Sequence, residues 1–184
     1  MPDKLASLDL EILADRKFAA AVGYFIISFS QLEEEMNRAV WALLNISADA
    51  RAYVITTAVR DFAQRMLLVS KLTKARWARD DRMRTDCSNV ISATRYINDI
   101  RNDLVHGSFN YWDALGEVAM FVRSDAKGSD EVQHAPVFFT INFLYELTIF
   151  TRNTTKAMLV FRLNARDGAD QELPSLDTRP PRPR

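Results

Sequence analysis

Apolar residues recur three and four positions apart over long stretches of this chain, which is the spacing of one face of an α-helix. The first such stretch covers about residues 15–45, with Asp15 as its start signal and an amphipathic lead-in at residues 3–13. Its apolar face contains Phe18, Val22, Phe25, Phe29, Leu32, Met36, Ala39 and Leu43. The first half is apolar on its other side too, so we expect that half to be buried all round and the second half to have a polar face.

Four further helices are predicted downstream. A short one runs to about Val59, and Asp61 has the residue type that caps a third helix. The fourth, about residues 82–106, has an apolar face of Met83, Cys87, Val90, Ala93, Ile97, Ile100 and Leu104. Thr140 can cap the last helix, about residues 141–163, whose inward set is Phe143, Leu147, Phe150, Thr154, Met158 and Phe161.

Between the last two helices the helical period gives way to alternation. Residues 117–122 and 132–140 predict two strands of a hairpin, with a polar turn between them and Pro136 marking an edge position. Because an isolated hairpin is barely stable in water, we expect it to lie on the helices or to pair with another chain. The predicted fold class is all-α: a bundle of four to five helices with a small β-hairpin inserted before the last helix.

Residues 1–163 are predicted to form a single helical domain, and residues 164–184 a disordered tail. A chain of 184 residues suits one domain with a full hydrophobic core. Apolar periodicity ends near Asn164, and the sequence closes with Thr-Arg-Pro-Pro-Arg-Pro-Arg, a composition that cannot bury much apolar surface.

Charge and rare residues narrow the classes of function. Lys plus Arg and Asp plus Glu balance at 24 each, so no global field attracts nucleic acid or an anionic membrane, and any nucleic-acid affinity must be local. One cysteine, Cys87, excludes an internal disulfide, fits a reducing compartment and, lying on an apolar face, is interpreted as a packing residue. With two histidines in the chain we expect no zinc site and no cofactor, and His134 is interpreted as an ordinary strand residue.

The start of the chain lacks the basic-then-apolar order of a signal peptide. The longest apolar run, Phe18 to Phe29, is too short to span a bilayer. We therefore expect a cytoplasmic protein with no membrane partner.

A basic stretch covers the end of the third helix and the turn after it. Asp80 and Asp81 are its only acidic residues, and the six basic ones are Lys71, Lys74, Arg76, Arg79, Arg82 and Arg84. Six minus two leaves about four net positive charges there. This cluster has two interpretations: an ordinary face of charged side chains in solvent, or, more specifically, a surface that contacts the backbone of RNA.

An arginine, an amide and a histidine that could carry chemistry lie in the last two turns of the predicted fourth helix: Arg101, Asn102 and His106, with Gly107 directly after His106. Because the helix macrodipole stabilises a cation at the C-terminus and glycine is common just past a helix end, a helix-ending role alone would explain Val-His-Gly. Arg101 could pair with Asp99, with Asp103 or with a glutamate of the first helix such as Glu33 or Glu34.

The arrangement Arg101-Asn102-x-x-x-His106, ending the fourth helix of a small bundle, resembles the HEPN superfamily (higher eukaryote and prokaryote nucleotide-binding domains). In that family an arginine, usually followed by a polar residue, precedes a histidine by a few positions. The resemblance rests on residues 95–109, together with the helix order over about residues 15–163. It implies that Arg101, Asn102 and His106 are the catalytic residues, and it assigns no others.

What the resemblance implies is an all-α bundle that acts as a homodimer, with two copies of the motif in a shared cleft. Many members look like metal-independent endoribonucleases, often toxins or defence effectors, so the expected partners are RNA, a second copy of the chain, and an antitoxin or other regulatory protein. Other members are non-catalytic nucleotide- or protein-binding modules, and that alternative stays open.

The residue types suit the chemistry. Cleaving RNA without metal needs a group that takes the 2′-hydroxyl proton, a group that protonates the leaving 5′-oxygen, and positive charge near the transition state. Histidine suits the proton transfers because an unperturbed imidazole titrates near neutrality, and the planar fork of arginine grips two phosphate oxygens. One histidine per motif supplies one of the two proton-transfer groups, and a dimer would supply both. The sequence contains no Gly-rich phosphate loop, nucleophile elbow or paired-carboxylate signature for unrelated enzyme chemistry.

Overall fold

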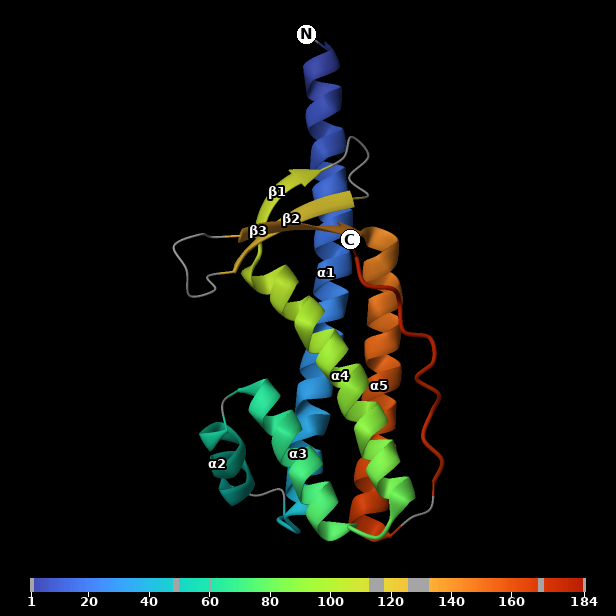
Figure 1. The fold of residues 1–184 in the computed structure, drawn as a ribbon. Helices are drawn as coiled ribbons and strands as arrows, with labels where there is room; N and C mark the ends of the chain where they lie inside the picture. Colours follow the sequence, from blue (N-terminus) through green and yellow to red (C-terminus); the bar gives the residue numbers. More distant parts are fainter. Residues whose placement is uncertain are drawn as a thin grey trace. The chain divides into compact units, whose positions relative to one another are not determined.

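Five helices and three strands make up the part of the chain that the computed structural model describes, residues 2–47, 50–59, 61–112, 118–125, 133–168 and 171–183 (Figure 1). The helices are α1 (Pro2–Leu43), α2 (Ala50–Ala58), α3 (Phe62–Arg76), α4 (Asp81–His106) and α5 (Ile141–Asp167). The strands are β1 (Ser108–Trp112), β2 (Val118–Asp125) and β3 (Gln133–Thr140). The predicted fold class, mostly helical with an antiparallel hairpin before the last helix, is confirmed.

These elements fall into two compact units, and α1, α4 and α5 each contribute residues to both. Unit 1 comprises Met1–Ile27, Asn98–Thr148 and Pro180–Arg184, and unit 2 comprises Ser28–Ile97 and Ile149–Arg179. The three-stranded sheet belongs to unit 1, whereas α2 and α3 belong to unit 2.

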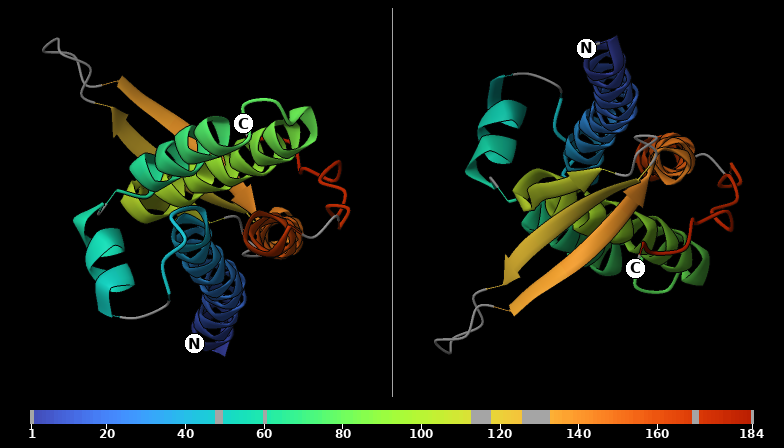
Figure 2. Two further views of the ribbon diagram at one scale, coloured as in Figure 1. Left: turned by 90° about the horizontal axis from the view of Figure 1, so that it is seen from below. Right: turned by 90° about the horizontal axis from the view of Figure 1, so that it is seen from above.

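Unit 2 is a bundle of segments from α1, α3, α4 and α5. Phe29 of α1 meets Phe62 of α3 edge to face with ring centroids 5.2 Å apart, and Tyr96 of α4 meets Phe150 of α5 in the same way at 6.0 Å. Figure 2 shows α3 and α4 running side by side. Large residues that are deeply buried in unit 2 include Leu32, Met36, Val40, Val69, Ile97, Phe150, Met158 and Phe161. The predicted apolar faces therefore supply this core.

In unit 1 the sheet is antiparallel with strand order β1-β2-β3, so β3 is an edge strand, in agreement with the position predicted for Pro136. Ala119 of β2 lies opposite Phe139 of β3, and both are fully buried. The ring of Phe139 lies 6.0 Å from that of Phe143 in α5. This face of the hairpin therefore packs on a helix, one of the two arrangements expected for an otherwise unstable hairpin.

Strand β1 was not predicted. It begins two residues after α4 ends and pairs with β2, with a register shift between Phe109 and Tyr111. The sequence Ser-Phe-Asn-Tyr-Trp has the aromatic content and alternation of a strand, but five residues directly after a helix give a weak local signal. The predicted turn at residues 123–131 lies largely outside the described residues, although β2 itself continues to Asp125.

Helix α1 differs from its prediction in two ways. It is a single helix from Pro2, with no break or cap at Asp15, because residues 3–13 are themselves rich in good helix formers. Its apolar first half is not buried all round: Phe18 and Phe25 are buried, but the side chains of Tyr24 and Ile27 are 51% and 60% exposed. Unit 1 therefore presents apolar side chains to solvent.

Both predicted helix caps that can be checked are confirmed. The Asp61 carboxylate accepts a hydrogen bond from the Ala63 backbone N–H at 2.8 Å, and the Thr140 hydroxyl accepts one from the Phe143 backbone N–H at 3.0 Å. Helix α5 continues past residue 163 to Asp167 and ends with Gly168 at φ 66°, the left-handed conformation that favours glycine.

The C-terminal segment, for which the sequence predicted a disordered tail, makes contacts with the helices. Residues 171–183 make defined contacts in the structure: the Asn164 side chain hydrogen-bonds both the N–H and the C=O of Gln171, at 3.2 and 2.8 Å, and Pro180 is buried. Arg179 places its guanidinium 5.0 Å from the ring centroid of Tyr96. These contacts, rather than apolar periodicity, hold the segment.

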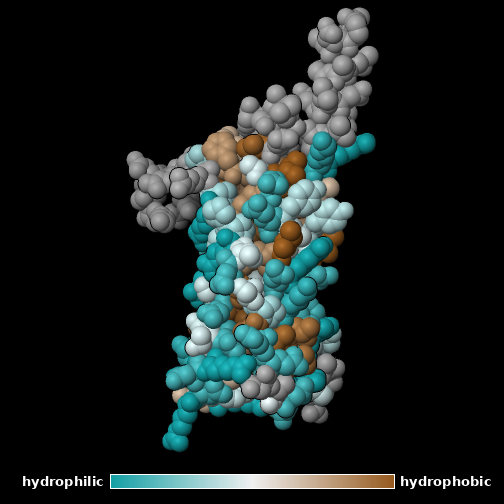
Figure 3. All heavy atoms as spheres, turned by 90° about the vertical axis from the view of Figure 1, so that its right-hand side faces the viewer, coloured by the Kyte–Doolittle hydropathy of each residue, from teal (hydrophilic) through white to brown (hydrophobic). Residues whose placement is uncertain are grey.

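Figure 3 shows one face of the molecule, where hydrophobic residues form separate patches among hydrophilic ones. In the described part of the chain, no helix combines the length and apolar character needed to cross a membrane.

Candidate functional site

The three motif residues lie on the last two turns of α4, inside unit 1. Helix α4 ends at His106, and the Gly107 N–H completes its final turn by donating to the Asp103 carbonyl at 3.0 Å. Ser108 then begins β1, which pairs with β2. The motif therefore lies at a helix–strand junction, with regular structure on both sides.

Helical geometry brings the three side chains toward one another. Asn102 and His106 are four residues apart, so they share one face of α4. Arg101 points off that face, but its Nη1 donates a hydrogen bond to Oδ1 of Asn102 at 3.1 Å. Arg101 and Asn102 are partly buried and His106 is exposed. None of the three residues is fully buried, and all three lie at one end of the helix.

A cation that the sequence did not single out lies beside the motif. Nη2 of Arg182 is 2.7 Å from Oδ2 of Asp99, and both side chains are well exposed. Asp99 precedes Asn102 by three residues on the same side of α4, so Arg182 offsets its negative charge near the motif. Nothing in the sequence links residue 182 to residue 99, because the contact joins segments 83 positions apart.

The three consecutive glutamates of α1 have partners in unit 2. Glu33 pairs with Arg65 at 3.7 Å and Glu34 with Arg38 at 3.1 Å. Glu35, the most buried of the three, contacts both Arg38 and Arg162. The polar face of the second half of α1, which the sequence predicted, is therefore used for ion pairs within the bundle.

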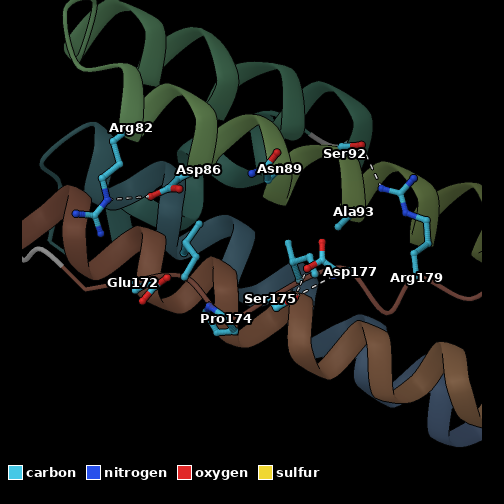
Figure 4. A pocket seen from close by; sticks show the side chains of 12 residues that line it. Arg82, Asp86, Asn89, Ser92, Ala93, Glu172, Pro174, Ser175, Asp177 and Arg179 are labelled. Carbon is cyan, nitrogen blue, oxygen red and sulfur yellow. Dashed lines mark hydrogen bonds and ion pairs between the residues drawn. The ribbon is translucent and has the colours of Figure 1, made fainter.

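A large cavity in unit 2 lies between α4 and the C-terminal segment (Figure 4). It measures about 820 Å³, and its charged side chains are of both signs: Arg82, Asp86, Glu172, Asp177 and Arg179. Arg82 lies 3.9 Å from Asp86, and the Ser175 hydroxyl bonds Asp177 at 2.7 Å. Burial raises the pKa of the Asp86 carboxyl, and the charge of Arg82 opposes that rise. This mixed lining does not select one class of ligand.

The basic residues predicted at the end of the third helix and in the turn after it do not share one function in the structure: some form contacts within the fold and others line a cavity. Arg76 Nη1 donates to the Ala42 carbonyl at 3.3 Å, at the C-terminus of α1, and its guanidinium lies 4.6 Å from the centroid of Trp77. Arg82 bonds the Gln171 carbonyl at 3.1 Å. Lys74 and Arg84 line a second cavity between α3 and α4, together with Arg95, which lies outside the predicted basic stretch.

Cys87 is buried, as interpreted from its apolar face, and burial raises the pKa of its thiol. The side chain of His134 lies outside the described residues. Among the described side chains there is no group of three or more His, Cys, Asp or Glu residues placed to hold a metal ion.

Comparisons with protein-family models, with curated proteins and with solved structures gave no match to this chain.

Proposed function

We propose that the protein is a metal-independent endoribonuclease that acts as a homodimer, with Arg101, Asn102 and His106 as its catalytic residues. The observation that supports this proposal is the geometry of the α4 terminus. An accessible imidazole and an amide share one helix face, and the neighbouring guanidinium is hydrogen-bonded to that amide. Together they offer a proton-transfer group and a fixed cation at one exposed place.

Each residue has a role that fits its chemistry. The imidazole of His106 takes the proton of the 2′-hydroxyl, and the same residue of a second protomer protonates the leaving 5′-oxygen. The Arg101 guanidinium binds the non-bridging phosphate oxygens and stabilises the charge that develops on them. Asn102 orients the guanidinium through their hydrogen bond. The products would carry a 2′,3′-cyclic phosphate on one fragment and a 5′-hydroxyl on the other.

Exposed apolar side chains in unit 1 support the homodimer. Besides Tyr24 and Ile27 of α1, Val105 is 46% exposed directly beside His106, and Tyr145 of α5 is 42% exposed. Burial of such side chains against a second copy would release apolar surface from water. A dimer formed near Val105 would bring two motifs together.

The decisive experiment is incubation of the purified protein with single-stranded RNA in the presence of a chelator. We expect cleavage by the wild type and a loss of at least about a hundredfold in His106→Ala and Arg101→Ala, because proton transfer and charge stabilisation each contribute on that order. The controls are His134→Ala, which changes the other histidine, and Lys156→Ala, which removes an exposed cation of α5. Both should cleave like the wild type.

Intact RNA with the wild type, or equal cleavage by His106→Ala, would refute the proposal. Binding of RNA or of nucleotides without cleavage would instead identify a non-catalytic binding module. A growth assay adds an independent readout: induction of the wild type should slow growth and induction of His106→Ala should not, as expected for a toxin controlled by a partner protein.

A further inference from the structure

The second cavity of unit 2 lies between α3 and α4, and all the charged side chains that line it are positive. It measures about 320 Å³, and the residues around it are Ser70, Thr73, Lys74, Arg84, Cys87, Ser88, Ile91, Ser92 and Arg95. Three of these side chains are cations and none is acidic. This separates it from the larger cavity beside the C-terminal segment, whose charges are mixed.

Helical spacing explains why these residues meet. Arg84, Ser88, Ser92 and Arg95 follow one another at intervals of four, four and three along α4, so they share a face. Ser70 and Lys74 are four apart on α3 and face them across the cavity. Because the facing positions hold serines rather than large apolar residues, the two helices leave a space between them.

The cavity has a buried floor and a polar rim. Thr73, Cys87 and Ile91 of the floor are 0%, 4% and 7% exposed, whereas Lys74, Arg84 and Arg95 of the rim are exposed. The Thr73 hydroxyl donates to the Val69 carbonyl at 2.9 Å, so its proton is already used within α3. Binding groups must therefore come from the cations and serines above this floor.

Those groups are available to a ligand. Lys74 and Arg95 have no ion-pair partner in the described part of the chain, and Ser70 and Ser88 have no hydrogen-bond partner there. Arg84 pairs with Asp81, whose side chain is 89% exposed, so solvent screens that pair strongly. The Ser92 oxygen accepts a bond from Arg179 at 3.2 Å, which leaves its proton free to be donated.

We propose that this cavity binds a phosphate monoester, such as the terminal phosphate of a nucleotide. Three cations around one space repel one another, and a dianion placed among them removes that repulsion. Arginine and lysine donors match phosphate oxygens, and serine hydroxyls supply the remaining hydrogen bonds. The volume is at the lower end of small-ligand sites, enough for a phosphate with a small attached group. The site does not involve the α4 terminus, so it stands or falls independently of RNA cleavage.

The test is calorimetric titration of the full chain with AMP and with adenosine at low ionic strength. AMP should bind the wild type and adenosine should not, and added salt should weaken the binding. Arg95→Gln and Lys74→Gln should each reduce AMP affinity at least about tenfold, because each removes a charge-assisted hydrogen bond. Arg79→Gln and Lys71→Gln remove exposed cations that do not line the cavity, and they should leave the affinity unchanged.

A second arm separates a terminal phosphate from the backbone of a nucleic acid. A short single-stranded oligonucleotide should bind more tightly with a 5′-phosphate than with a 5′-hydroxyl, and Arg95→Gln should abolish that difference. Absence of AMP binding, or equal affinities of the wild type and Arg95→Gln, would overturn the proposal. Equal binding of the two oligonucleotides would also overturn it, because the cavity would then recognise backbone diesters.

Discussion

The carboxylate of Glu35 lies between two guanidinium groups: Arg38 Nη1 is 2.8 Å from Oε1, and Arg162 Nε is 3.1 Å from Oε2. The Glu35 and Arg162 side chains are only 11% and 15% exposed, so this contact ties α1 to α5 inside the bundle of unit 2. A carboxylate this far from solvent depends on its partners for the hydrogen bonds that water would otherwise supply.

Replacement of Arg162 by methionine should destabilise the protein by about 1–3 kcal/mol, since Glu35 would keep only Arg38. Methionine preserves most of the apolar stem, so the loss reports mainly on the charge. The measurement is the urea unfolding midpoint. The control is Arg166→Met, which removes an exposed arginine of the same helix paired with its neighbour Asp167. An equal shift of both midpoints would contradict a special role of Arg162.

The cap between β3 and α5 gives a second prediction. Thr140→Ala should lower the free energy of unfolding by about 0.5–2 kcal/mol, because it removes the acceptor of the Phe143 N–H at the start of α5. Thr140→Ser keeps the hydroxyl and should retain most of the stability. Thermal unfolding of the two variants and the wild type checks this order, and a serine variant as unstable as the alanine variant would argue against capping.

The buried thiol of Cys87 gives a third prediction: the free energy of unfolding should fall as the pH rises through the alkaline range. Burial raises the thiol pKa in the folded state above its ordinary value of 9.0. The folded protein therefore holds the proton at pH values where the unfolded chain releases it. The stability that the protonated thiol contributes is fully present below the thiol pKa of the unfolded chain. It is lost as the pH rises through the thiol pKa of the folded protein.

We expect the wild type to lose more stability between pH 7.5 and pH 10 than Cys87→Ala does, although the variant starts lower because of the cavity it creates. The comparison of the two slopes removes the contributions of lysines and tyrosines, which titrate in both proteins. Parallel slopes from unfolding midpoints at several pH values would show that the thiol does not titrate differently on folding.

The attachment of the C-terminal segment gives a fourth prediction. Asn164 is 5% exposed, and its amide forms two hydrogen bonds to the backbone of Gln171. Asn164→Ala removes both, so hydrogen exchange of the Gln171 amide should accelerate at least several-fold. Asn153→Ala, a change at another asparagine of α5, should leave that exchange rate unchanged. If the Gln171 amide exchanges as fast in the wild type as in an unstructured peptide, the segment is not held as the structure shows.

Local signals in the sequence determined most of the secondary structure. The apolar faces of α1, α4 and α5 follow from spacings of three and four residues. The caps at Asp61 and Thr140 follow from side chains that reach their own backbone two or three residues away. The end of α4 at His106 was predicted from Gly107, because glycine is common just past the end of a helix. The motif and its position at a helix end are therefore readable from residues 95–109 alone.

Only the tertiary structure decided which of these elements meet. Three contacts or groupings show this: Arg182 pairs with Asp99, Arg162 pairs with Glu35, and Arg95 lines the same cavity as Lys74. The residues in each of these pairs lie between about twenty and well over one hundred positions apart in the sequence. Such contacts depend on how helices pack and on which facing positions hold small side chains, and neither leaves a periodic signal. The same reason explains β1 and the held C-terminal segment, since each is fixed by a partner distant in sequence rather than by its own pattern.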